Sequence, residues 1–237
     1  MKNINSRFKG APWILPTESD AALFIPYSMI YIGGAGGIGS WTTLFLSRAG
    51  FYTYVQDFDE VEEHNVGGQF YNIQSMGQYK VHALQNLISA FTGNDYICSS
   101  CTIAVDEQTE GHLFMISAFD NMKARKDYFA SWKRAIENSI DPLTSKDSLF
   151  IDGRLSMEGY EIYCVTPDKI EEYEETLFAD EEVEEAPCSM KQTTHVAAMI
   201  GSQITSLFTN HVTNIRAGKA IRSVPFKYTF FTPLFCN

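Results

Sequence analysis

A short apolar segment that runs directly into a cluster of glycines is the strongest constraint on the fold of this 237-residue chain. The apolar segment is 29–33, and four glycines follow it within six positions: Gly34, Gly36, Gly37 and Gly39. This order predicts a buried strand, a tight turn and a helix that begins near residue 37. A second apolar segment, 51–57, follows that helix, so the first 60 residues contain a predicted strand–helix–strand unit.

The glycines and the acid at the end of the second strand together predict a nucleotide site. Gly34 permits the tight turn, Gly36 lets the backbone approach a phosphate, and Gly39 lets the helix pack close to the sheet. Asp57 and Asp59 follow Gly39 at about the distance expected for a ribose-binding acid, roughly 20 residues. The start of the helix adds unpaired N–H groups that attract an anion. The alternative is a glycine-rich turn with a structural role alone.

Strands and helices alternate along the rest of the chain, which predicts an α/β fold with a doubly wound, mostly parallel, Rossmann-like sheet. Helices are expected over residues 37–49, 80–92, 123–138 and 193–215. Strands are expected over residues 29–33, 51–57, 95–99, 113–117, 148–152 and 161–165, with a strand-like tail at 225–235. The last strands are expected to be antiparallel. Because no internal repeat or linker is visible, we expect a single domain over 1–237, with an N-terminal arm (1–28), a polar connection (59–76) and an acidic crossover loop (166–190).

The net charge of −11 is concentrated in one segment. Residues 168–185 contain ten acidic residues and one lysine, so the rest of the chain is nearly neutral. With no basic patch, nucleic acid is not expected as a partner. The chain has no uninterrupted apolar run of about 18 residues and no signal peptide at its start, so we expect no membrane span and a cytoplasmic location.

The five cysteines indicate free thiols, because an odd number without an export signal argues against a disulfide framework. Cys98 and Cys101 form a single C-x-x-C pair, whereas a structural zinc site needs a second pair or suitably spaced histidines. Zinc is therefore not expected. Cys164 lies within a predicted strand and is expected to pack in the core.

Further motifs, in order along the chain, resemble the ubiquitin-activating (E1-like) superfamily in its ThiF/MoeB/HesA branch. The matching segments are the glycine loop 34–40, the acidic segment 57–69, the lysine segment 77–80, the segment 118–121 followed by Arg125, and the segment 153–160. The resemblance implies an E1/ThiF-type fold that uses ATP and Mg²⁺. It also implies adenylation of the C-terminal carboxylate of a ubiquitin-like protein, a sulfur-carrier protein or a peptide. Relatives are usually dimers, so a homodimer is expected.

The resemblance also implies roles for individual side chains. Lys80 would contact phosphate, Asp120 would hold Mg²⁺ beside Asn121, and Asn65 and Gln69 would donate to phosphate oxygens. Lys80 and Asp120 are therefore expected to be catalytic residues. Each also has an ordinary interpretation: Lys80 as a surface lysine at a helix start, Asp120 and Asn121 as a helix cap, and Asn65 as a turn residue.

One position departs from the family pattern. Gly68 stands where the family usually has an arginine, so a guanidinium that would neutralise the triphosphate is missing. Arg125, which we also count as catalytic, or Arg154 would have to compensate, or Arg7 from the N-terminal arm of a partner subunit. The alternative for Arg125 is a solvent-facing side chain.

Cys188 follows the acidic segment at the predicted start of a helix and is a candidate thioester nucleophile. A helix N-terminus and the neighbouring Lys191 would favour its thiolate. The alternatives are a remnant of a zinc cysteine motif and an inert thiol. Two other functions remain open for the chain: a nucleotide-binding protein without catalysis, suggested by Gly68, and an NAD-dependent oxidoreductase, which the glycines and Asp57 would also suit.

Overall fold

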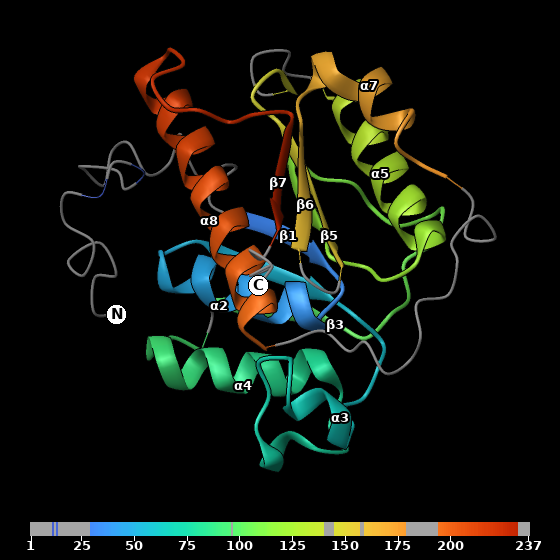
Figure 1. Ribbon diagram of the computed structural model, residues 1–237, viewed down its shortest axis with the longest axis vertical. Coiled ribbons are helices and arrows are strands. Elements are labelled where there is room, and N and C mark those ends of the chain that lie inside the picture. The colour runs from blue at the N-terminus through green and yellow to red at the C-terminus, as the bar shows by residue number, and fades with distance from the viewer. Residues whose placement is uncertain are drawn as a thin grey trace, which may run out of the picture.

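A seven-stranded mixed sheet forms the centre of the computed structural model, within the described residues 11, 13, 29–95, 97–139, 145–156, 159–178 and 194–231 (Figure 1). The strands are β1 (Met29–Gly33), β2 (Tyr52–Gln56), β3 (Cys98–Cys101), β4 (Phe114–Ser117), β5 (Leu149–Leu155), β6 (Gly159–Val165) and β7 (Lys227–Phe231). Their order is β3-β2-β1-β4-β5-β6-β7. β1 to β5 are parallel to one another, and β6 pairs antiparallel with both of its neighbours, β5 and β7. The predicted fold class is confirmed.

Helices cover both faces of this sheet. They are α2 (Gly37–Arg48), α3 (Glu63–Val66), α4 (Lys80–Thr92), α5 (Met122–Glu137), α7 (Ile170–Glu174) and α8 (Thr194–Ala217), with 3₁₀ turns η3 (Ile73–Ser75) and η4 (Pro167–Lys169). Figure 1 shows α8 on one side of the sheet and α5 with α7 on the other. Within the part of the chain that the structure describes, no helix is both long and apolar enough to cross a membrane.

Side chains of β5 alternate between the two faces of the sheet, which explains why different helices pack on each face of this strand. A Cβ atom at Gly153 would lie 3.1 Å from Ile204 and 3.4 Å from Ile200, both on α8. The preceding residue, Asp152, instead contacts Arg125 of α5. Successive strand residues point to opposite faces of the sheet, so Gly153 of β5 packs toward α8 and Asp152 packs toward α5.

Two apolar clusters fill the spaces on either face of the sheet. The larger, on the side of α2, α4 and α8, includes Ile30 and Ile32 of β1, both fully buried. The smaller, under α5 and α7, is aromatic and includes Trp132, Phe150 and Tyr173. These clusters hold the strands so that the carboxyl ends of β1, β2 and β4 lie along one edge.

Element boundaries differ from the sequence prediction where pairing decides them. β3 begins at Cys98 because Cys98 is in register with Thr53 of β2, whereas the prediction placed the strand at 95–99. The predicted polar connection 59–76 contains α3 and η3, and the acidic crossover begins with η4 and α7. Most of the N-terminal arm and the second half of the crossover lie outside the described residues.

The cysteines of the described part of the chain are free thiols, two of them buried and one partly exposed. Cys98 packs in the larger cluster, where burial raises the pKa of its thiol to about 11. Cys101 lies three positions later and lines a cleft with Tyr31 and Tyr54, so the two thiols face opposite sides of the strand. Cys164 is in the core, as predicted, and burial raises its pKa to about 12. No metal-binding cluster of His, Cys, Asp and Glu is present among the residues that the structure describes.

Trp132 provides a test of the aromatic cluster. Its side chain is fully buried, and its Nε1 donates to the carbonyl of Leu113 at 3.2 Å. We expect Trp132→Ala to lower the free energy of unfolding by about 3–5 kcal/mol, because a large cavity would remain under α5. Urea denaturation measures this. Ile103→Ala is the control: Ile103 is 66% exposed, and its truncation should change stability by less than about 0.5 kcal/mol. Equal effects of the two variants would contradict the assignment of the core.

Candidate nucleotide-binding site

The glycine turn after β1 is shaped by close backbone contacts. Gly34 has a positive φ of 91°, and a Cβ atom there would lie 2.8 Å from the carbonyl oxygen of Ala118. A Cβ atom at Gly39 would lie 1.8 Å from the carbonyl oxygen of Gly34. The roles predicted for these two glycines, a tight turn and close packing of the helix, therefore match the observed geometry.

The start of α2 is open toward the carboxyl edge of the sheet. Its first intrahelical bond runs from the Ser40 amide to the Gly36 carbonyl at 3.0 Å, so the amides of Gly37, Ile38 and Gly39 are the N-terminal donors of this helix. A Cβ atom at Gly36 would meet no atom closer than the Nε2 of Gln69, at 4.0 Å. Space and donors for an anion therefore coincide at this helix end.

Asp57 links the end of β2 to the glycine turn. Its Oδ2 accepts from the Ala35 amide at 2.6 Å, and its Oδ1 accepts from the Asp59 amide at 2.8 Å. Burial raises the pKa of this carboxyl, and the two amide hydrogen bonds oppose that rise. Asp57 thus lies against the turn, as a ribose-binding acid would.

Lys80 reaches the same edge from the first residue of α4. Its Nζ lies 2.7 Å from the Oδ2 of Asp59, and its amide donates to the Asp59 carbonyl at 2.8 Å. The lysine side chain is only 10% exposed, whereas Asp59 is half exposed. A largely buried ammonium is therefore held at the site by one carboxylate, with further N–H donors available to a ligand.

Asn65 and Gln69 lie in a segment that is tied to α2. Trp41 donates its Nε1 to the Gly68 carbonyl at 3.2 Å, which brings this segment beside the glycine turn. The Oδ1 of Asn65 is already used, because it accepts from the Glu62 amide at 2.8 Å. The Oε1 of Gln69 is buried and has no hydrogen-bond partner within the described structure. Gln69, with its Nε2 near Gly36, is the better placed of the two for a ligand.

Asp120 and Asn121 follow β4 and are next to Phe119, whose amide is close to Gly34. Asp120 is exposed, and its Oδ1 accepts from the Nδ2 of Asn121 at 3.3 Å. Asn121 also caps α5, because its Oδ1 accepts from the Ala124 amide at 2.8 Å. A single accessible carboxylate fits Mg²⁺, which commonly takes one or two protein carboxylates and completes its shell with phosphate oxygens and water.

Arg125 and Arg154 are both paired with the carboxylate of Asp152. Arg125 is buried and forms an ion pair with Asp152, and it also donates to the carbonyls of Gly153 and Phe119. Arg154 is held by the other oxygen of the same carboxylate, at 2.7 Å. Burial alone would lower the pKa of Arg154, but the Asp152 carboxylate raises it, and the net shift is upward. Neither guanidinium is free to replace the arginine missing at Gly68.

Some residues that shape the site were not identified from the sequence. Tyr71 donates its hydroxyl to the Ala35 carbonyl at 2.6 Å, and Ser40 accepts from the Phe70 amide at 3.0 Å. Asp152 is fully buried between two arginines. A lone Tyr or Ser carries no local signal for such a contact. An Asp inside an apolar strand segment does carry one, because a buried carboxylate needs a partner.

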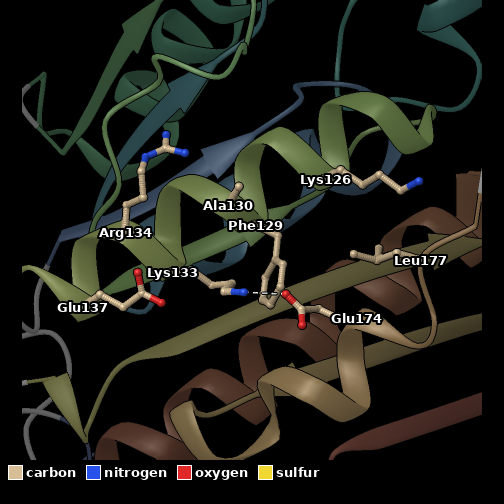
Figure 2. Close-up of a pocket in the computed structure, with 8 residues that line it drawn as sticks. All are labelled: Lys126, Phe129, Ala130, Lys133, Arg134, Glu137, Glu174 and Leu177. Carbon is tan, nitrogen blue, oxygen red and sulfur yellow. Dashed lines mark hydrogen bonds and ion pairs between the residues drawn. The ribbon is translucent and has the colours of Figure 1, made fainter.

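Two concave surfaces of the described structure have linings that differ from this site. One is a groove of about 520 Å³ between α5 and α7, where Lys133 and Glu174 form an ion pair across the cleft (Figure 2). The other is the cleft lined by Tyr31, Tyr54 and Cys101. Neither is lined by the glycine turn, Lys80 or Asp120. Cys188 and Arg7, predicted as a nucleophile and a possible phosphate ligand, lie outside the described residues.

The model of the ThiF family matches residues 20–232. The chain therefore belongs to the ThiF family. No curated protein sequence matches the chain significantly.

Solved structures share its fold. A crystal structure of Escherichia coli TcdA, a tRNA N6-threonylcarbamoyladenosine dehydratase, superposes with a TM-score of 0.62 at 17% identity, over 91% of this chain and 97% of TcdA. PaaA gives a TM-score of 0.61 at 17% identity, over 87% of this chain and 61% of PaaA. E. coli MccB gives 0.62 at 12% identity, over 88% and 62%. The chain thus spans less than two thirds of PaaA and MccB. Other structures of TcdA and MccB contain ATP.

Gly39 and Gly36 form a matched pair that tests the geometry of the turn. Adding a methyl group at Gly39 would force it into the Gly34 carbonyl. We expect Gly39→Ala to destabilise the fold by about 1–3 kcal/mol through overpacking, although alanine is ordinarily the better helix former. Gly36→Ala meets open space and should leave the thermal midpoint nearly unchanged. Thermal unfolding followed by circular dichroism measures both, and a Gly39→Ala protein as stable as wild type would refute the close approach.

Proposed function

We propose that this member of the ThiF family is an ATP-dependent adenylyltransferase. Its substrate would be the C-terminal carboxylate of a ubiquitin-like protein, a sulfur-carrier protein or a peptide. One observation carries the proposal: the N-terminus of α2, the buried Lys80 and the exposed Asp120 lie along the same edge of the sheet. A dinucleotide site needs the glycine turn and Asp57, but it has no use for a buried lysine and a free carboxylate at this edge.

Each side chain has a role that its observed contacts allow. Asp57 would accept hydrogen bonds from ribose hydroxyls. The amide of Gly36, the first-turn amides of Gly37, Ile38 and Gly39, and the Nε2 of Gln69 would donate to phosphate oxygens. The assignments of Asp59, Asn65 and Asn121 rest on their positions beside these groups. They hold Lys80, the 62–70 segment and the start of α5 in place.

The reaction needs positioning and charge relief more than proton transfer. A carboxylate oxygen attacks the α-phosphorus of ATP, a new C–O–P linkage forms, and the bond to pyrophosphate breaks. The carboxylate is already ionised at neutral pH, so no general base is required. Lys80 would stabilise the charge that develops on the pyrophosphate, and Mg²⁺ held by Asp120 would supply the second positive charge.

The comparisons support a nucleotide rather than a particular substrate. TcdA and MccB have been solved with ATP, and they share this fold at identities too low to carry over a substrate. A carrier protein or peptide, passage of the activated group to Cys188, and a homodimer in which Arg7 reaches the partner's site are parts of the proposal that rest on the family resemblance.

A second candidate is a nucleotide-binding protein that does not catalyse adenylation. It is favoured by Gly68 and by the engagement of Arg125 and Arg154 with Asp152, which leave Lys80 as the cation at the described site. Binding of ATP without exchange of pyrophosphate in the presence of carrier proteins would favour this candidate.

The first test is calorimetric binding of ATP with Mg²⁺ to wild type and two variants. Lys80→Ala should weaken ATP binding about 10- to 100-fold, because a charge-assisted hydrogen bond contributes about 1.5–3 kcal/mol. Asp120→Ala should remove the dependence of that binding on Mg²⁺, and both variants should lose ATP–pyrophosphate exchange.

Lys219→Ala is the matched control, because Lys219 is exposed just beyond the end of α8, whereas the site segment contacts the other end of this helix through Thr194 and Gly67. It should bind ATP as wild type does. Wild-type protein that binds NAD but not ATP would overturn the proposal, and so would Lys80→Ala and Asp120→Ala variants that retain full ATP binding.

A further inference from the structure

A buried carboxylate connects two segments that the proposed reaction uses. Asp152 of β5 has no exposed surface, and its two oxygens pair with different arginines. Burying an ion pair seldom adds stability relative to apolar residues of similar size. The apolar cluster formed by Phe150, Trp132 and Tyr173 is on the same face of the sheet, so an apolar residue would suit this position. Stability of the fold alone therefore does not explain a carboxylate at residue 152.

Arg125 connects the carboxylate to the residue before Asp120. One of its terminal nitrogens contacts Asp152 and donates to the Gly153 carbonyl at 3.0 Å, and the other donates to the carbonyl of Phe119. The side chain of Asp120 is exposed, and its hydrogen bond among the described residues is the 3.3 Å contact with Asn121. Arg125 thus holds the backbone carbonyl that directly precedes Asp120.

Arg154 connects the same carboxylate to the end of α7. It donates to the Thr176 carbonyl at 3.1 Å and to the Thr176 hydroxyl at 3.0 Å. Its guanidinium lies over the ring of Tyr163, 4.5 Å from the centroid, and 5.8 Å from that of Tyr173. Thr176 begins the part of the acidic crossover that leads in sequence to Cys188.

The contacts through Arg125 and those through Arg154 therefore meet at the carboxylate of Asp152. A movement of Phe119 would change its hydrogen bond with Arg125, and a movement of Thr176 would change its hydrogen bonds with Arg154. The buried carboxylate of Asp152 needs both arginines to remain paired. Removing one partner of a buried pair is costly because it leaves an uncompensated charge. The network thus resists independent motion of the Asp120 segment and the crossover.

We propose that Asp152 is a positioning residue that couples the nucleotide site, through Arg125 and the Asp120 segment, to the acidic crossover, through Arg154 and Thr176. The proposal rests on the proposed function, since it takes the site to bind ATP with Mg²⁺. Binding at Asp120 then stabilises residues 170–178 at the start of the crossover, and by thermodynamic reciprocity stabilising these residues tightens ATP binding by the same factor.

The test uses the full-length protein with ATP and Mg²⁺. Hydrogen exchange of the amides at 170–178 is measured with and without nucleotide, and the ATP dissociation constant is measured by calorimetry. In wild type, nucleotide should slow exchange in 170–178. In Arg154→Met, which keeps the Asp152–Arg125 pair, this slowing should be lost and ATP binding should weaken about fivefold or more, the lower range of measured couplings.

Two further variants distinguish coupling from general destabilisation. Asp152→Asn should give the same loss with a larger effect on affinity. Glu174→Gln cuts the ion pair with Lys133, visible in Figure 2, which ties α7 to α5 without touching Asp152. It should preserve the nucleotide-dependent protection. If Asp152→Asn does not fold, Arg154→Met alone decides.

The outcomes separate this inference from the proposed function. ATP binding in wild type with unchanged exchange in 170–178 overturns the coupling and leaves the proposed function intact. The same result follows if Arg154→Met retains both the protection and the affinity. Absence of ATP binding in wild type overturns both.

Discussion

The hydrogen bond from the Ala35 amide to the Asp57 carboxylate is the interaction on which the candidate site depends. It joins the turn after β1 to the end of β2 at 2.6 Å, and the Tyr71 hydroxyl donates to the carbonyl of Ala35. Asp57 also orders the Asp59 amide, and Asp59 in turn pairs with Lys80. The Asp57 carboxylate thus fixes the position of the glycine turn relative to the end of β2 and, through Asp59, relative to Lys80.

Electrostatics around this edge are divided between two groups of charges. At the turn, Asp57 and Asp59 face Lys80, so the site carries more negative than positive charge before a nucleotide arrives. The two arginines that would reverse this balance are engaged by Asp152 on the α5 face of the sheet. Phosphate binding by the described residues therefore depends on the α2 amides, on Lys80 and on a metal ion, and Gly68 makes that dependence stronger.

Much of this could be predicted from local sequence. The strand–turn–helix at 29–48 and the helix at Lys80 follow from apolar periodicity and from glycines whose spacing has a steric reason, as the 1.8 Å approach at Gly39 illustrates. The boundaries of β3 could not be predicted in the same way, because they follow its register with β2. Likewise, no local pattern shows that Arg125 binds Asp152, 27 positions away, rather than solvent or phosphate.

The sequence by itself determined the fold class, the position of the glycine turn and the residue types at the carboxyl ends of the strands. Each of these depends on steric or periodic rules that act over a few residues. Only the tertiary structure decided which charges are available for chemistry. Lys80 stays at the site edge, whereas Arg125 and Arg154 are committed to a buried carboxylate. That outcome depends on how strands and helices far apart in the chain pack together, because burial makes an unpaired charge too costly to leave alone.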